Sequence, residues 1–88
     1  MKRIGVIGAV LEKPQQSQAA FNEIVAAFRG SVKGRMGIPF DQEEIAVISL
    51  TVMGELDDLN TLSGKLGNLP HVTAKIAISN ALKHEGEE

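Results

Sequence analysis

The sequence predicts a small α+β domain in which four strands and two helices follow the order β-α-β-β-α-β. Three observations carry this prediction: two stretches with apolar residues at helical spacing, four stretches rich in alternating or β-branched residues, and glycine or proline at most junctions. The 88 residues suffice for one domain with a modest core, so we expect association with further copies to add stability.

The first predicted strand spans residues 3–11, where apolar side chains occupy both alternating faces. One face carries three apolar side chains beside Gly8, and the other carries Ile7, Ala9 and Leu11. A strand that is apolar on both faces is typical of the centre of a sheet.

The first predicted helix spans residues 15–28 and follows Pro14, which suits the first helical position because proline lacks an amide hydrogen. Apolar side chains recur at i, i+3, i+4 and i+7 between Phe21 and Phe28, so we expect both phenylalanines in the core. Gly30 is expected to stop the helix.

Two further strands form a predicted hairpin. Residues 32–38 make the first of them, and Pro39 is expected to end it because proline cannot donate a hydrogen bond to a ladder. A polar connection over residues 41–44 leads to residues 45–53, a stretch rich in β-branched side chains. One face of this strand is uniformly apolar and comprises Ala46, Ile48, Leu50 and Val52.

The second half of the chain repeats the strand-helix-strand pattern. Four leucines at helical spacing predict a helix over residues 56–66. Asp57 and Asp58 lie in its first turn, where carboxylates favour the positive end of the helix dipole. Gly67 is expected to stop this helix, and residues 72–79 form the last predicted strand.

This order is that of the ferredoxin-like fold, in which two helices cover one face of a four-stranded antiparallel sheet and the first and third strands are central. The opposite face of the sheet would then expose apolar side chains in a monomer. We therefore expect that face, a sheet edge or both to be buried against another subunit. The residues predicted for the interface are Ile7, Ala9, Leu11, Val47 and Met53.

Composition argues against several classes of function. The net charge of −2 and the three aromatic residues give no footprint for direct nucleic-acid binding, and the absence of cysteine removes thiolate chemistry. No apolar run is long enough for a membrane span, so a cytoplasmic location is expected. The single domain is placed at residues 1–81, and residues 82–88 are expected to form an acidic, frayed tail.

The sequence carries no recognised catalytic or metal-binding motif. Nucleotide-binding loops, metalloprotease motifs and nucleophile elbows are absent, so no catalytic residue, metal ligand or cofactor is predicted. His71 is interpreted as a surface histidine, with metal binding between subunits as the alternative. An enzyme built between subunits is a further alternative, and its mark would be a pocket that brings together Arg35, His71 and a carboxylate.

The stretch Gly34–Pro39 is the candidate ligand site. Glycines let a backbone approach a ligand, and Arg35 can hold a carboxylate or phosphate through two hydrogen bonds. The alternative is that Arg35 is an exposed strand residue and that the glycines accommodate twist, a bulge or subunit packing. The predicted ligand-binding residues are Gly34, Arg35, Met36, Gly37, Gly8 and Gly64.

Four segments together resemble a known family: Arg3–Gly8, Gly34–Pro39, Ile48–Leu50 and Leu62–Gly67. Their combination, which extends over residues 3–79, is similar to that of the iron-only hydrogenase system regulators. The resemblance implies an ACT-like ferredoxin fold, similar to the C-terminal domain of the nickel-responsive repressor NikR. It also implies assembly as dimers or tetramers and the binding of small effectors at subunit interfaces.

The chain differs from a NikR-type repressor in two respects. No DNA-binding segment is expected before Arg3, and the several histidines and the cysteine of the nickel site are missing. We therefore expect a homo-oligomeric, non-enzymatic regulatory module without nickel sensing or direct DNA contact. It would bind a small effector at a subunit interface and act on a protein partner linked to an iron-only hydrogenase system. An oligomerisation domain that binds no ligand is the alternative.

Overall fold

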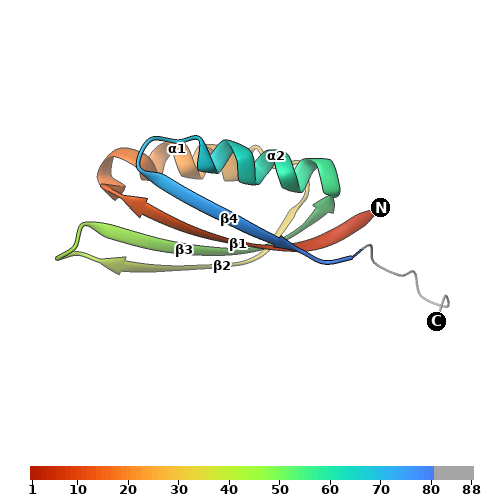
Figure 1. Cartoon of the computed structure of the whole chain (residues 1–88), viewed down its shortest axis with the longest axis horizontal. Coiled ribbons are helices and arrows are strands. Elements are labelled where there is room, and N and C mark those ends of the chain that lie inside the picture. The colour runs from red at the N-terminus through yellow and green to blue at the C-terminus, as the bar shows by residue number, and fades with distance from the viewer. Residues whose placement is uncertain (81–88) are drawn as a thin grey trace.

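The computed structural model describes residues 1–80 and has the predicted order of elements in two layers (Figure 1). The elements are β1 (Lys2–Glu12), α1 (Pro14–Ala26), β2 (Ser31–Phe40), β3 (Ile45–Glu55), α2 (Leu56–Gly67) and β4 (Val72–Ile78). The expected frayed tail at residues 82–88 lies outside the described residues. No helix within residues 1–80 is long and apolar enough to cross a membrane.

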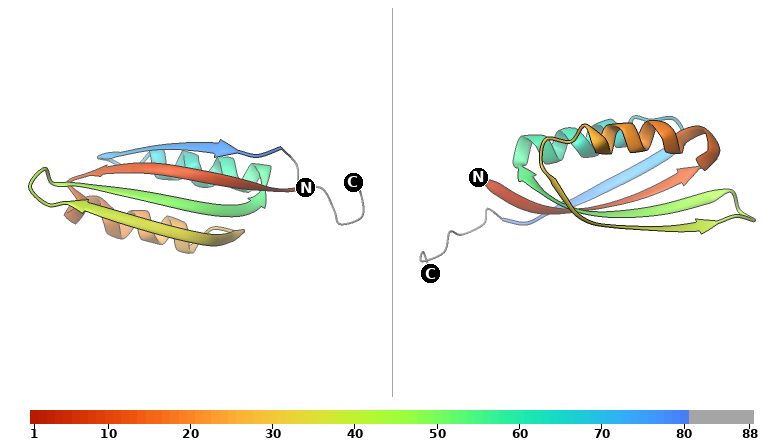
Figure 2. Two further views of the ribbon diagram at one scale, coloured as in Figure 1. Left: turned by 90° about the horizontal axis from the view of Figure 1, so that it is seen from below. Right: turned by 180° about the vertical axis from the view of Figure 1, so that it is seen from behind.

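The sheet is antiparallel, and its strand order is β2-β3-β1-β4. The central strands are therefore β1 and β3, as their apolar faces predicted, and β2 and β4 form the edges. Both helices lie over one face of the sheet, which we call the covered face (Figure 1). The opposite face, called the open face, has no described helix over it in the view from below (Figure 2, left).

The core lies between the covered face and the two helices. Phe21 of α1 is fully buried, and Phe28 is half-buried and packs against the core, so both phenylalanines lie where the helical spacing predicted. The uniformly apolar side of β3 is the side that faces the helices, as expected. The buried apolar side chains are Ile7, Ala9, Leu11, Phe21, Ile48, Leu50, Val52, Leu59, Leu62, Leu66 and Val72.

The predicted outer face of β1 is wrong. Ile7, Ala9 and Leu11 belong to the covered face, where each is at most 1% exposed. Because both faces of β1 are apolar, the strand's own pattern does not say which face the helices cover. Pairing with β3 decides it: Ile7 lies opposite Leu50, and directly opposed residues of antiparallel strands point to the same face.

The open face is apolar over most of its area. Val47 and Met53 of β3 lie on it, as predicted, and both are half-buried among their neighbours. The large exposed apolar side chains of β1 and β2 on this face are Ile4, Val6, Val10, Met36, Ile38 and Phe40. An exposed apolar face of the sheet is thus present, as predicted, although three of the residues predicted for it lie on the covered face.

The second strand also differs from its prediction. β2 continues past Pro39 to Phe40, with Pro39 opposite Ala46. Proline is tolerated there because β2 is an edge strand. A register shift between Val32 and Gly34 marks a bulge, so one of the structural alternatives for this glycine-rich stretch is present.

The end of α1 is a further difference. The helix ends at Ala26, so Gly30 is not its stop. A Cβ atom at Gly30 would overlap the Met53 carbonyl oxygen and lie 2.6 Å from the Phe28 ring. This glycine is therefore required by the close approach of β3 and a core side chain.

Candidate functional site

The structure divides the predicted ligand-binding residues among three places. Gly8, Gly34 and Met36 lie on the open face, where Gly8 and Met36 are the two partners of Ser49. Gly64 lies in α2, in the layer that covers the opposite face (Figure 1). These residues therefore do not form a single site within one subunit.

Arg35 and Gly37 remain together on the side of β2 that faces α1. The Arg35 Nη2 group donates a hydrogen bond of 2.6 Å to the Asn22 Oδ1 atom of α1. The guanidinium carbon also lies 5.8 Å from the centre of the Phe21 ring, within the range of a cation–π contact. Arg35 thus connects the edge strand to the first helix.

A cleft of about 480 Å³ lies between α1 and the β2–β3 hairpin, next to Arg35. Gly37 and Ala46 contribute little or no side chain to its floor, which leaves room for a bound molecule. The amide side chains of Gln15 and Gln18 line the α1 wall. The cleft therefore combines an apolar floor with hydrogen-bonding groups along one side.

The two ends of this cleft differ in charge. Arg35 supplies a guanidinium at one end, whereas Asp41 and Glu44 of the hairpin turn supply carboxylates at the other. Asp41 follows Arg35 by six residue steps along extended chain, which corresponds to about 20 Å. A guanidinium has five N–H donors, of which Asn22 takes one, so Arg35 can also hold a carboxylate or phosphate.

Three amide residues of α1 were missed at the level of the sequence. Gln15, Gln18 and Asn22 follow the i, i+3, i+7 spacing that places side chains on one face of a helix. That spacing is the signal that could have identified them. It does not say which strand the amide face would meet, and the structure supplies that strand as β2.

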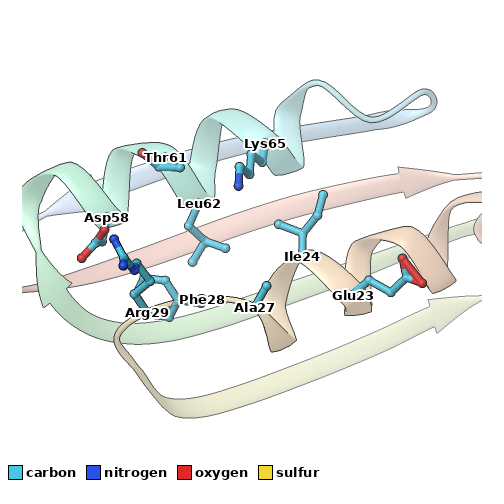
Figure 3. A pocket seen from close by; sticks show the side chains of 9 residues that line it. All are labelled: Glu23, Ile24, Ala27, Phe28, Arg29, Asp58, Thr61, Leu62 and Lys65. Carbon is cyan, nitrogen blue, oxygen red and sulfur yellow. The ribbon is translucent and has the colours of Figure 1, made fainter.

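A second hollow, of about 420 Å³, lies between α1 and α2 (Figure 3). Arg29 stands beside Asp58 at one end of it, and Glu23 and Lys65 stand at the other (Figure 3). Each end carries one charge of each sign, so neither end selects an ion of one sign. The apolar residues that line it are Ile24, Ala27, Phe28 and Leu62.

The groups named for an enzymatic alternative are far apart within the subunit. Arg35 lies on β2 opposite Leu50, whereas His71 precedes β4 at the other edge of the sheet. Three strand spacings and about five residues along the strands separate them, which is on the order of 20 Å. His71 is exposed, and its carbonyl oxygen accepts a 2.7 Å hydrogen bond from the Glu12 amide.

The clearest effect of one charge on the pKa of another group lies at the surface, at Glu55. The N-terminal ammonium donates a 2.7 Å hydrogen bond to Glu55 Oε1, and this contact lowers the pKa of the Glu55 carboxyl. Asp57 and Asp58 lie in the first turn of α2, as predicted. Within residues 1–80, no three histidine or acidic side chains come together as metal ligands.

Comparison with known proteins gives one family and several structural likenesses. The model of the TM1266-like family, described as "Iron-only hydrogenase system regulator, putative", matches residues 3–76. The uncharacterized protein TM1266 from Thermotoga maritima is 29% identical with a TM-score of 0.84, over 91% of this chain and 100% of that chain. No curated protein matches the sequence.

Two more distant structures share the fold. The ACT domain from GTP pyrophosphokinase of Chlorobium tepidum is 19% identical with a TM-score of 0.76, over 88% of this chain and 100% of that chain. SnoaB, a cofactor-independent oxygenase from Streptomyces nogalater, is 12% identical with a TM-score of 0.55, over 99% of this chain and 100% of that chain. The predicted ferredoxin-like, ACT-like fold is confirmed, but the fold alone does not decide between binding and catalysis.

Proposed function

Since the chain belongs to the TM1266-like family of iron-only hydrogenase system regulators, we propose that it is a non-enzymatic regulatory domain. It acts as a homo-oligomer through the open face of its sheet. It binds a small anionic effector in the cleft beside Arg35, and it passes the effect to a protein partner of the hydrogenase system.

The exposed apolar surface of the sheet is the observation that carries this proposal. On the open face, Met36 is 60% exposed, Val6 is 49% exposed and Ile38 is 47% exposed. Monomeric proteins rarely keep an apolar patch larger than a few hundred Å² in water. Covering such a patch with a second subunit is favourable by about 25 cal/mol for each Å² of apolar surface.

The cleft beside Arg35 supports the effector part of the proposal. Arg35 is held by the Asn22 amide oxygen and the Phe21 ring, so its charge has a defined position at one end of the cleft. An anion bound there would bridge β2 and α1. Because β2 also contributes residues to the open face, a change in β2 would reach the subunit that covers this face.

The separation of the polar groups supports a non-enzymatic role. General acid–base or nucleophilic catalysis needs at least two chemical groups within hydrogen-bond reach of one reacting atom. Arg35 and His71 do not meet within the subunit, since they lie at opposite edges of the sheet. The cleft itself offers a cation, amides and an apolar floor, which are groups for binding.

Light scattering tests the oligomer. At micromolar concentration we expect the mass of a dimer or a larger assembly, because the apolar open face would otherwise stay in water. A sharp monomer peak over the whole concentration range would contradict the proposal.

A thermal-shift series tests the effector cleft. Inorganic phosphate, nucleotides and amino acids are the probes, since a ligand that binds only the folded state raises Tm. Arg35→Ala is expected to abolish the shift, whereas Lys33→Ala on the same strand serves as the matched control and should retain it. If a probe still raises the Tm of the Arg35→Ala variant, the effector binds at another site. An oligomer with no responsive probe would favour the oligomerisation domain that binds no ligand.

A further inference from the structure

We infer that the open face packs on the open face of a second copy about a two-fold axis that runs across the strands. In this arrangement two glycines of each subunit receive a valine and a phenylalanine of the other, while Met36 meets Ile38. The inference rests on the proposed homo-oligomer and specifies its interface. It follows from the strand register, the unfilled glycines and the apolar exposure of this face.

The register places a path of small residues across the open face. The path, which we call the trough, runs from β2 over β3 to β1 and comprises Gly34, Thr51, Ser49 and Gly8. Gly34 lies opposite Thr51, and Ser49 lies opposite Gly8. The trough therefore crosses three neighbouring strands at the middle of the face.

Larger apolar residues follow the trough towards the hairpin end of the same strands. This set, which we call the ridge, comprises Phe40, Ile45, Val47 and Val10. Phe40 lies opposite Ile45 on β2 and β3, and Val47 lies opposite Val10 on β3 and β1. Phe40 and Val10 are among the exposed apolar side chains of the molecule, at 44% and 39%.

The two glycines of the trough have no function in packing within the subunit. A Cβ atom added at Gly8 or Gly34 would meet nothing within 4 Å, whereas one added at Gly54 would lie 3.2 Å from the Phe28 ring. A glycine inside a strand costs about 0.5–1 kcal/mol relative to alanine. Gly8 lies in a central strand, so the space above it is available for a side chain from outside the subunit.

The symmetry axis follows from matching these two sets. Symmetric dimers use the same patch on both subunits, so each trough must meet the ridge of the partner. We place the two-fold axis perpendicular to the strands, between trough and ridge. Each strand then lies over the same strand of the second copy and runs in the opposite direction. Gly8 then faces the second copy's Val10 position, and Gly34 faces its Phe40 position.

The other in-plane axis gives a poorer fit. A two-fold axis along the strands keeps each row of residues over itself and places β1 over β3. Gly8 would then face a serine, at the Ser49 position, and Val10 would face another valine, at the Val47 position. Small residues would oppose small ones and large would oppose large, which leaves gaps that closely packed interfaces do not have.

The size and charge of the face fit a second copy. Four strands and four rows of residues cover about 19 Å by 26 Å, or about 500 Å² in projection, and side-chain relief brings this towards the roughly 800 Å² per partner of a standard interface. Lys75 lies on the edge strand β4 and Glu12 at the end of β1. Lys75 therefore lies at the rim. Glu12 lies in the end row, over Val6 of the second copy, and its flexible side chain can extend past the end of the sheet into water.

An exchange of one trough residue with one ridge residue tests the inference. Gly8→Val fills the trough, and we expect the dimer dissociation constant from sedimentation equilibrium to rise about tenfold or more. The swap variant Gly8→Val/Val10→Gly again presents one valine to one glycine, so we expect affinity within about threefold of the wild type. Gly64→Ala on α2 is the matched glycine control and should leave the constant unchanged.

Circular dichroism separates loss of assembly from loss of folding. Because nothing lies within 4 Å of a Cβ at Gly8, Gly8→Val should retain the native spectrum as a monomer. If it does not fold, Gly34→Phe with the swap Gly34→Phe/Phe40→Gly repeats the test on the edge strand.

The outcomes separate this inference from the proposed function. A monomeric wild type would overturn the homo-oligomer itself. If the wild type is a dimer and Gly8→Val leaves its dissociation constant unchanged, the inference is overturned and the homo-oligomer is built on another surface. Weakening by Gly8→Val without rescue by the swap would overturn the axis proposed here.

Discussion

The two faces of the sheet are built from similar side chains but differ in what covers them. Ile4 and Ile7 lie three residues apart on β1; Ile7 is 0% exposed under the helices, and Ile4 is 37% exposed on the open face. Hydrophobicity of the strand is the same on both sides, so it does not distinguish them. Only the layer of helices makes one face the core and leaves the other available for association.

The glycines of the molecule fall into two groups by the space around them. Gly5, Gly30 and Gly54 lie in tight surroundings, each with a neighbour that a side chain would meet. Gly8 and Gly34 on the open face have nothing within 4 Å of a Cβ position. The three tight glycines are thus explained by packing within the subunit. Gly8 and Gly34 on the open face are not, and neither is Gly37, which lines the cleft beside Arg35.

Truncating one isoleucine on each face should give the largest difference in stability between the two faces. Ile7→Ala is expected to lower the free energy of unfolding by about 2–5 kcal/mol, because it leaves a cavity in the core. Ile4→Ala, on the same strand, should cost only about 1 kcal/mol. Urea unfolding at one protein concentration measures both, and equal losses would contradict the assignment of the faces.

Substitution by alanine tests the difference between glycines in tight surroundings and glycines with open space around them. Gly30→Ala should destabilise the fold by about 1–3 kcal/mol, because the new Cβ would overlap the Met53 carbonyl oxygen. Gly64→Ala, within α2, should instead stabilise by up to about 1 kcal/mol, since alanine favours a helix. Thermal unfolding of the two variants should therefore shift Tm in opposite directions.

Arg35 connects the exposed edge strand to the covered side, and its removal should have a smaller effect. Arg35→Ala is expected to cost about 1 kcal/mol or less, because its hydrogen bond to Asn22 is exposed. A double-mutant cycle with Asn22→Ala isolates the pair, with an expected coupling of about 0.5 kcal/mol. Strictly additive losses would show that the contact contributes nothing to stability.

The ion pair at the start of β1 should give the smallest effect. The N-terminal ammonium lowers the pKa of Glu55, so the pair stabilises the fold above the carboxyl's ordinary pKa and loses that effect as pH falls through the lowered value. Acetylation of the N-terminus should raise the Glu55 pKa towards its ordinary value. An NMR titration of the side chain measures it, and an unchanged pKa would assign the shift to another cause.

Much of the candidate site lay beyond what a linear pattern can specify. Arg35 was identified from the sequence as a possible anion clamp, because its guanidinium chemistry is independent of the fold. The contacts of Arg35 with Asn22 and Phe21 were not predicted, because they join residues of β2 and α1. The relative position of these two elements depends on how the helix layer packs on the sheet. Gly64 was grouped with Arg35 by residue type, and the structure places it elsewhere.

The order of the elements, the central positions of β1 and β3, and the hairpin turn between β2 and β3 could all be predicted from the amino-acid sequence. Those features follow from periodicity, propensity and turn chemistry, which act over a few neighbouring residues. The buried side of β1 could not be predicted in this way, because both sides are apolar and the pairing of Ile7 with Leu50 sets which of them faces the helices. The close fit of Gly30 against β3 and the alignment of small residues across three strands of the open face were equally beyond prediction, since long-range register and packing create both arrangements.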